Sequence, residues 1–205
     1  AHLSGELMAL QAVLEFRTRS ITRFVQASAE MIRRAGLGVG LDCFSPGLAY
    51  MVGQDLGALD KQGEWVKLMS YHHALGPAGL PFELGDLAAW AIAEGRAREG
   101  EALAWLSAAV RLSLPRTLAA LRGQGLGPEA LAQELRRGRR SGVRMLWAGI
   151  ELVEIAGICT LQENQVQASL SAIRDVGVDG LVLSWDLLHV PEARLRLVAK
   201  LLQSG

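Results

Sequence analysis

The stretch GLVLSWDLLHVP, residues 180–191, turns from an apolar run to side chains that can take part in chemistry. Trp185, Asp186 and His189 bring an aromatic ring, a carboxylate and an imidazole close together in the chain. In glycoside hydrolysis one carboxylic acid protonates the glycosidic oxygen, a second carboxylate stabilises the oxocarbenium-like centre, and a ring can provide an apolar platform. These residue types therefore favour a saccharide site near this stretch, which other segments must complete.

Polar side chains also follow the other apolar, strand-like segments. Asp42 follows GVGL, Tyr71 and His72 follow EWVKLMS, and the segment VRMLWAGIELVEI contains Glu151 and Glu154. Because the reactive groups of a parallel barrel gather where its strands end, we expect these residues to converge on one site. The predicted catalytic residues are Glu151, Glu154 and Asp42. The predicted substrate-binding residues are Tyr71, His72, Trp185, Asp186 and His189.

Each of these residues also has a structural interpretation. Asp42 and Lys67 have the parity to lie on the same side of neighbouring strands, where they would form a buried ion pair. Trp185 can belong to the core instead of a platform, and the loop glutamates can simply be solvated. The adjacent His72 and His73 point to opposite sides of a strand, which makes them weak evidence for a metal. We therefore predict no metal and no cofactor. The prediction of a site rests on the shared position of these residues at strand ends.

The elements that must position these residues alternate between apolar strands and amphipathic helices. Apolar residues at helical spacing predict one long helix over residues 6–35, and Gly36 stands where its C-cap would be. The alternation that follows predicts a parallel α/β sheet with right-handed crossovers. The expected strands lie in GVGLDCFSP and at residues 65–71, 143–155 and 180–186; the expected helices lie at 54–62, at three or four places between 81 and 138, at 163–176 and after Pro191.

Four strand–helix units are half of an eight-stranded barrel, which normally takes about 250 residues. We therefore predict a single domain over residues 1–205 that forms the C-terminal half of a TIM-type barrel, with a helical insertion over residues 81–140. The first and fourth strands of a half barrel have open edges. For this reason we expect a partner, either a missing N-terminal barrel half or a second copy in a homodimer.

The composition of the 205 residues limits the function classes. Hydrophobic residues make up 50% and charged residues 20%, as in a globular domain. The formal net charge is zero, which argues against nucleic acid as a partner. Apolar runs are far shorter than the ~20 residues of a membrane span, so no membrane partner is expected. Cys43 and Cys159 lack CxxC spacing, and a cytoplasmic location is the default, with a removed signal peptide left open.

Two strand segments carry a family resemblance. WVKLMSY, with Met69 and Tyr71 as a Met-x-Tyr pair, resembles the sixth strand of chitinase-like glycoside hydrolases, and GLVLSWDL is similar to the last strand of the same barrels. In those barrels a tryptophan lies at the floor of the sugar site, here Trp185. The order of segments resembles bacterial glycoside hydrolase-like barrel proteins over nearly the whole chain. The resemblance implies that the proton-donating glutamate lies on an upstream strand, and that Glu151 or Glu154 stands where retaining barrel glycosidases carry their nucleophile.

Three function hypotheses follow from these observations. The first is a glycoside hydrolase-like barrel protein that binds a saccharide and, if an N-terminal half completes it, hydrolyses the saccharide by carboxylate general acid/base chemistry. The second is a non-catalytic carbohydrate-binding or assembly protein on a degenerate barrel. The third is a phosphate-handling barrel such as an aldolase or isomerase. It is disfavoured because no Gly-rich phosphate loop follows the third or fourth predicted strand.

Overall fold

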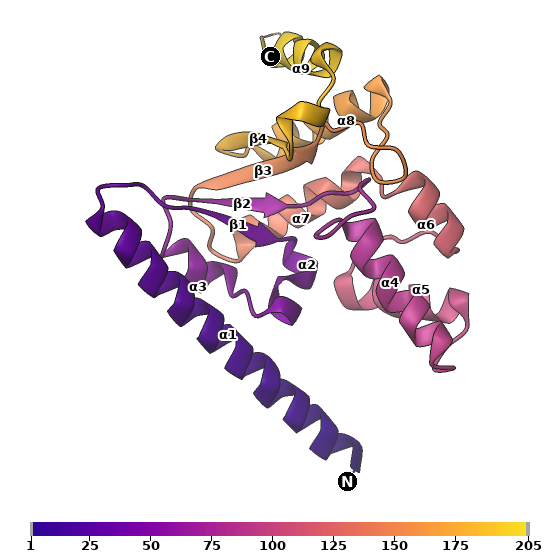
Figure 1. The fold of residues 1–205 in the computed structure, drawn as a ribbon. Coiled ribbons are helices and arrows are strands. Elements are labelled where there is room, and N and C mark those ends of the chain that lie inside the picture. The colour runs from indigo at the N-terminus through magenta and orange to yellow at the C-terminus, as the bar shows by residue number, and fades with distance from the viewer. Residues whose placement is uncertain (1, 204–205) are drawn as a thin grey trace.

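The computed structural model describes residues 2–203 as an α/β protein (Figure 1). Four parallel strands form a sheet in the order β1-β2-β3-β4, so strands that are consecutive in the chain lie side by side. The strands are β1 (Gly40–Phe44), β2 (Trp65–Met69), β3 (Leu146–Glu151) and β4 (Gly180–Ser184). The predicted parallel sheet with alternating helices is confirmed. Half of a TIM-type barrel is not confirmed, because an open sheet of four parallel strands with β1 and β4 at its edges is also compatible with other α/β folds.

Helices precede, connect and follow the strands. Helix α1 (His2–Arg34) precedes β1, and β1 is joined to β2 by α2 (Pro46–Ala49), the 3-10 helix η1 (Tyr50–Val52) and α3 (Leu56–Asp60). Between β2 and β3 the chain forms α4 (Leu80–Ala93), α5 (Glu99–Val110), α6 (Leu118–Gln124) and α7 (Pro128–Arg140). Helix α8 (Glu163–Val176) leads to β4, which is followed by the 3-10 helix η2 (Leu187–His189) and by α9 (Glu192–Gln203).

The third strand is shorter than the sequence predicted. The apolar run suggested residues 143–155, but β3 covers only Leu146–Glu151. Before this strand, the backbone N–H of Arg144 donates to Asp60 Oδ1 at 3.0 Å. After it, the carbonyls of Leu152 and Val153 accept hydrogen bonds from the Arg194 guanidinium. The apolar run therefore includes buried residues before and after the strand as well as the strand itself.

The two faces of the sheet differ, as the period of two in a strand requires. On one face Cys43, Leu68 and Ala148 are buried in a core that includes residues of α3, α7 and α8. The other face carries the alternate strand residues, among them Trp65 and Trp147, whose stacked rings have centroids 4.7 Å apart. A second apolar cluster packs α4, α5 and α6 against one another. The polar residues of the candidate site lie on the second face of the sheet.

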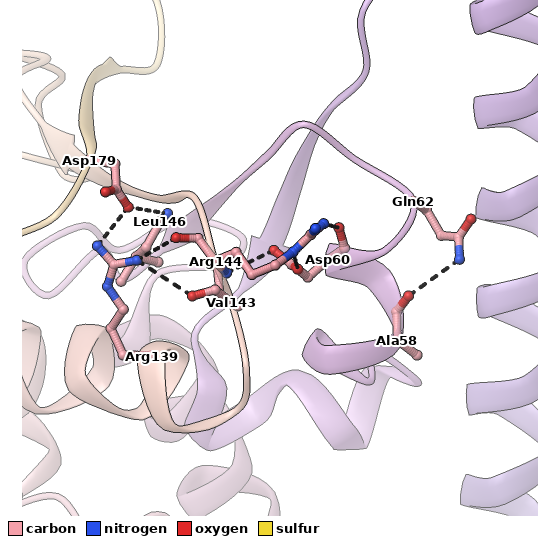
Figure 2. A network of polar contacts seen from close by, with 8 residues as sticks. All are labelled: Ala58, Asp60, Gln62, Arg139, Val143, Arg144, Leu146 and Asp179. Carbon is pink, nitrogen blue, oxygen red and sulfur yellow. Dashed lines mark hydrogen bonds and ion pairs between the residues drawn. The ribbon is translucent and has the colours of Figure 1, made fainter.

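Figure 2 shows a polar network at the amino-terminal ends of the strands. The Asp60 carboxylate accepts a hydrogen bond from Arg144 Nε at 2.5 Å. Asp179 accepts the backbone N–H of Leu146 at 2.7 Å and pairs with Arg139 at 2.6 Å. Arg139 also donates to the carbonyl of Arg144 at 2.7 Å. The network joins the end of α7 to the starts of β3 and β4, and so fixes the sheet at the end opposite the candidate site.

Helix α1 lies at the margin of the molecule. It contacts η1 and α3, and its amino-terminal part projects away from the sheet (Figure 1). Ala29, near its carboxyl end, is buried at 1% exposure. Neither α1 nor any other helix within residues 2–203 is apolar over a length that would cross a bilayer.

Candidate functional site

A cavity of about 620 Å³ opens on the second face of the sheet, near the carboxyl ends of the strands. Of the predicted site residues, Asp42, Tyr71 and Trp185 line this cavity. Two other cavities, of about 480 and 640 Å³, lie beside His73 and between α7 and α8. Ligand sites typically combine apolar walls with a few convergent polar groups. We take the 620 Å³ cavity as the candidate site because Asp42, Lys67, Tyr71 and Ser184 converge there among apolar walls that include Met69, Val182 and Trp185.

An ion pair lies at one wall of the cavity. Asp42 is the middle residue of β1, not the residue that closes the strand as predicted, and its Cα pairs with that of Lys67 on β2. Lys67 Nζ donates to Asp42 Oδ2 at 2.7 Å, with side-chain exposures of 6% for Lys67 and 53% for Asp42. Burial opposes the charged form of Lys67, but the hydrogen bond to Asp42, the nearby Tyr71 and the charge of Asp42 together outweigh burial and raise the pKa of Lys67. Lys67 is therefore a fixed cation and donor, and the predicted ion pair forms with its carboxylate accessible.

Two hydroxyl groups and an indole complete the polar and aromatic lining. The hydroxyl oxygen of Tyr71 lies 2.6 Å from Ser184 Oγ, and both residues are buried. The peptide bond between Ser184 and Trp185 is cis. The Trp185 side chain is 43% exposed, and its ring centroid lies 5.8 Å from that of Tyr71. Trp185 therefore borders the cavity with an accessible ring and is not enclosed in the core.

Glu151, a predicted catalytic residue, does not reach the cavity. It is the last residue of β3 and is fully buried, where its Oε1 accepts the backbone N–H groups of His73 (2.8 Å) and Ala74 (3.1 Å). Burial raises the pKa of Glu151, while the backbone hydrogen bonds act in the opposite direction. The carboxylate therefore holds the loop that follows β2, including the backbone beyond Tyr71, and takes no place in the lining.

Three more predicted site residues make local contacts outside the cavity. Glu154 forms an ion pair with Arg194 of α9. Asp186 and His189 pair with each other, and Asp186 also accepts the backbone N–H of Leu188 at 2.9 Å. The hydrogen bond from His189 is the main cause that lowers the pKa of Asp186. These residues stabilise the turn after β4 and the start of α9, and their predicted catalytic and binding roles stay predictions.

The adjacent histidines follow β2 instead of lying in it, and their ring centroids are 4.2 Å apart, so the prediction that they point to opposite sides of a strand was wrong. His72 also lies outside the cavity lining. His72 is fully buried, with Nε2 at 3.1 Å from Ser169 Oγ and Nδ1 at 3.6 Å from Glu151 Oε2. Burial lowers its pKa to about 4. Burial, followed by the proximity of His72, also lowers the pKa of His73 to about 4. Within residues 2–203 no group of three or more His, Cys, Asp or Glu side chains is placed to hold a metal ion.

These histidines make stability depend on pH. In the folded protein their pKa is lowered to about 4 from the ordinary 6.5, so between these values the unfolded chain binds more protons. We therefore expect the stability that the neutral histidines provide to be complete above pH 6.5 and to be lost as the pH falls toward 4. For buried His72 the loss should reach roughly 2 to 3 kcal/mol. Glu151 acts in the opposite sense, because its raised pKa favours its protonation in the folded state.

Urea denaturation at a series of pH values between 7 and 4.5 measures this dependence. His72→Gln should reduce the slope of unfolding free energy against pH by at least about half, because it removes one of the two imidazoles and the neighbour that helps to lower the pKa of the partly buried His73. His189→Gln is the matched control, since His189 lies in an exposed turn. Equal slopes for the wild type and His72→Gln would contradict the assignment.

Several residues that shape the cavity were not predicted from the sequence. Ile155 and Ile158 line it from the loop after β3. Arg194, on α9, donates to the carbonyls of Leu152 and Leu161 at 3.0 and 2.6 Å and thereby holds both ends of that loop. The only available signal was an arginine four residues before Val198, on the apolar face of the predicted last helix.

Comparisons with known proteins do not identify a family for this chain. No family model matches the chain, and no curated protein matches it. One solved structure is similar, named "Alpha/Beta hydrolase fold protein of unknown function". The two chains are 15% identical, the similarity covers 87% of this chain and 70% of the other, and the TM-score is 0.34. A similarity of this size assigns neither a shared fold nor an activity.

These comparisons correct the predicted family. The resemblance to glycoside hydrolase-like barrels was wrong: neither a family model nor a curated protein of that kind matches the chain. The segments WVKLMSY and GLVLSWDL each contain a short apolar strand that is followed by an aromatic residue, and apolar strands are general in parallel sheets. The predicted functions depended on this family. Saccharide hydrolysis and the alternative of a carbohydrate-binding protein are therefore not supported.

Proposed function

We propose that the 620 Å³ cavity binds a small molecule with a flat apolar body and a neutral polar end that both donates and accepts hydrogen bonds. The Asp42–Lys67 pair carries this proposal. Its charges cancel, so the wall favours a neutral group over an ion. Its acceptor and donor lie 2.7 Å apart, and the oxygen and N–H of a carboxamide or lactam can bridge such a pair.

The rest of the lining supports an apolar body. The volume lies within the roughly 300 to 1,000 Å³ typical of small-molecule pockets. The rings of Tyr71 and Trp185, tilted by 54° to each other, provide two aromatic surfaces beside Met69 and Val182. Because Lys67 is held as a cation by Asp42, it acts as a hydrogen-bond donor and not as a nucleophile. We therefore propose that the ligand binds reversibly.

Ligand-observed NMR with four probes of similar shape tests the proposal. Benzamide should bind, and benzoate and benzylammonium should bind at least about fivefold more weakly, because each brings a charge that the neutral wall does not compensate. Toluene should bind through the apolar walls alone. Trp185→Ala should weaken benzamide binding about tenfold, the equivalent of a lost aromatic contact.

Two further variants sharpen the result. Trp105→Ala removes an exposed tryptophan of α5 outside the cavity and should leave binding unchanged. The double variant Asp42→Leu/Lys67→Met removes donor and acceptor together, so the preference for benzamide over toluene should disappear. The proposal fails if no probe binds, or if benzamide binds equally to the wild type and Trp185→Ala.

A further inference from the structure

Helix α1 has two apolar faces, and only the carboxyl-terminal part of one of them packs against other described residues, since Leu7 and Leu10 on the same side are 60% and 55% exposed. On the inner face, Val25 packs against the sheet core and Ala29 is buried. On the outer side, Phe16, Phe24 and Met31 are 63%, 70% and 70% exposed. An apolar surface of this length on a soluble molecule normally marks an interaction site.

The exposed residues follow a regular pattern that we name the outer stripe. Its members recur every three or four residues, the spacing of a helix–helix seam. They are Ala9, Val13, Phe16, Ser20, Phe24, Ala27 and Met31. With a rise of 1.5 Å per residue, the stripe is about 33 Å long. A partner that covers it must therefore present an elongated surface, such as a second helix.

We propose that the outer stripe binds the same stripe of a second copy of this chain in an antiparallel helix pair. The stripe is self-complementary in size when the two helices cross at Ser20. Phe16 then lies opposite Phe24, Val13 opposite Ala27, and Ala9 opposite Met31. Large side chains thus face small ones at both ends, and serine leaves room for close approach at the crossing point.

A parallel, in-register pair is less favourable in packing. It would place Met31 against Met31 and Ala9 against Ala9, which crowds one end of the seam and leaves the other loosely packed. In the antiparallel pair Arg17 and Arg23 come to the same level, but at 100° per residue they project from opposite flanks of the stripe.

The placement of α1 in the fold permits this pair. The helix lies at the margin of the molecule, with η1 and α3 on its inner side (Figure 1). In the antiparallel arrangement the two sheets lie at opposite ends of the helix pair, because each is joined to the carboxyl end of its own α1. The interface is independent of the cavity, so a failure of the proposed ligand binding would not affect it.

Sedimentation velocity of the whole chain tests the interface. The mass of one chain is 22.0 kDa, and the expected species at micromolar concentration has twice that mass. Phe16→Glu/Phe24→Glu should raise the dissociation constant at least 100-fold and leave the circular dichroism unchanged. Met8→Glu is the matched control: Met8 is 72% exposed on the same helix but lies outside the stripe, so its dimer should persist.

Disulfide trapping tests the direction of the helices. Ser20→Cys should cross-link to itself under mild oxidation, and a mixture of Ala9→Cys and Met31→Cys proteins should cross-link as a heterodimer. The native cysteines, Cys43 and Cys159, are buried and do not interfere. A monomer at tens of micromolar, a dimer that the glutamate variant leaves intact, or efficient self-cross-linking of Ala9→Cys would each overturn the proposal.

Discussion

Arg194→Met should lower the free energy of unfolding by about 4 kcal/mol, the largest effect we expect from one substitution. The buried guanidinium donates to the carbonyls of Leu152 (3.0 Å), Val153 (2.8 Å) and Leu161 (2.6 Å) and pairs with Glu154. Methionine fills a similar volume but leaves these buried carbonyls without a donor. Urea denaturation at pH 7 measures the change.

Arg196→Met is the control for this effect. Arg196 lies on the same helix, is 77% exposed and pairs with Glu192 one turn earlier. Its loss should cost less than about 0.5 kcal/mol, as for other exposed ion pairs. Because Arg194 also holds the loop that carries Ile155 and Ile158, Arg194→Met should weaken benzamide binding as well. Similar stabilities for the two variants would show that Arg194 does not hold this loop.

Glu134→Ala should destabilise the protein by about 3 kcal/mol. Glu134 of α7 is completely buried, and its carboxylate accepts the Ser45 hydroxyl (2.7 Å), the backbone N–H of Gly47 (2.6 Å) and Arg137 (2.6 Å). It therefore joins α7 to the segment that follows β1. Alanine would leave three donors without this acceptor in a largely buried site.

Two substitutions separate this role from a general effect on α7. Glu134→Gln keeps one acceptor oxygen and should cost less than the alanine variant. Glu129→Ala changes an exposed glutamate in the first turn of the same helix and should cost at most about 1 kcal/mol through the helix dipole. Thermal denaturation of the three variants gives the order. An equal loss for Glu134→Ala and Glu129→Ala would contradict the buried role.

The sequence contained enough information for part of the site. Asp42 and Lys67 have the parity that places them on one face of neighbouring strands, and their ion pair forms at 2.7 Å. Tyr71 and Trp185 follow apolar runs, and both line the cavity at the carboxyl ends of the strands. These inferences succeeded because the period of two and the parallel order of consecutive strands are properties that a short window of sequence encodes.

The remaining residues depend on contacts that no local pattern reports. Glu151 follows the same rule as Tyr71, yet its carboxylate turns to the backbone of His73 and Ala74, residues 78 and 77 positions away. Glu154 turns to Arg194, 40 residues away. A carboxylate at a strand end can serve a site or satisfy buried N–H groups, and the residue type alone does not distinguish these uses.

By itself the sequence determined the strands, their order, the long first helix and the polarity of the strand ends. Each of these follows from the side-chain pattern within about ten residues, which sets burial and therefore secondary structure. Only the tertiary structure decided which polar groups share a cavity and which hold loops. That choice depends on which donors and acceptors are left unsatisfied when distant segments pack, because a buried polar group binds the nearest partner the fold provides.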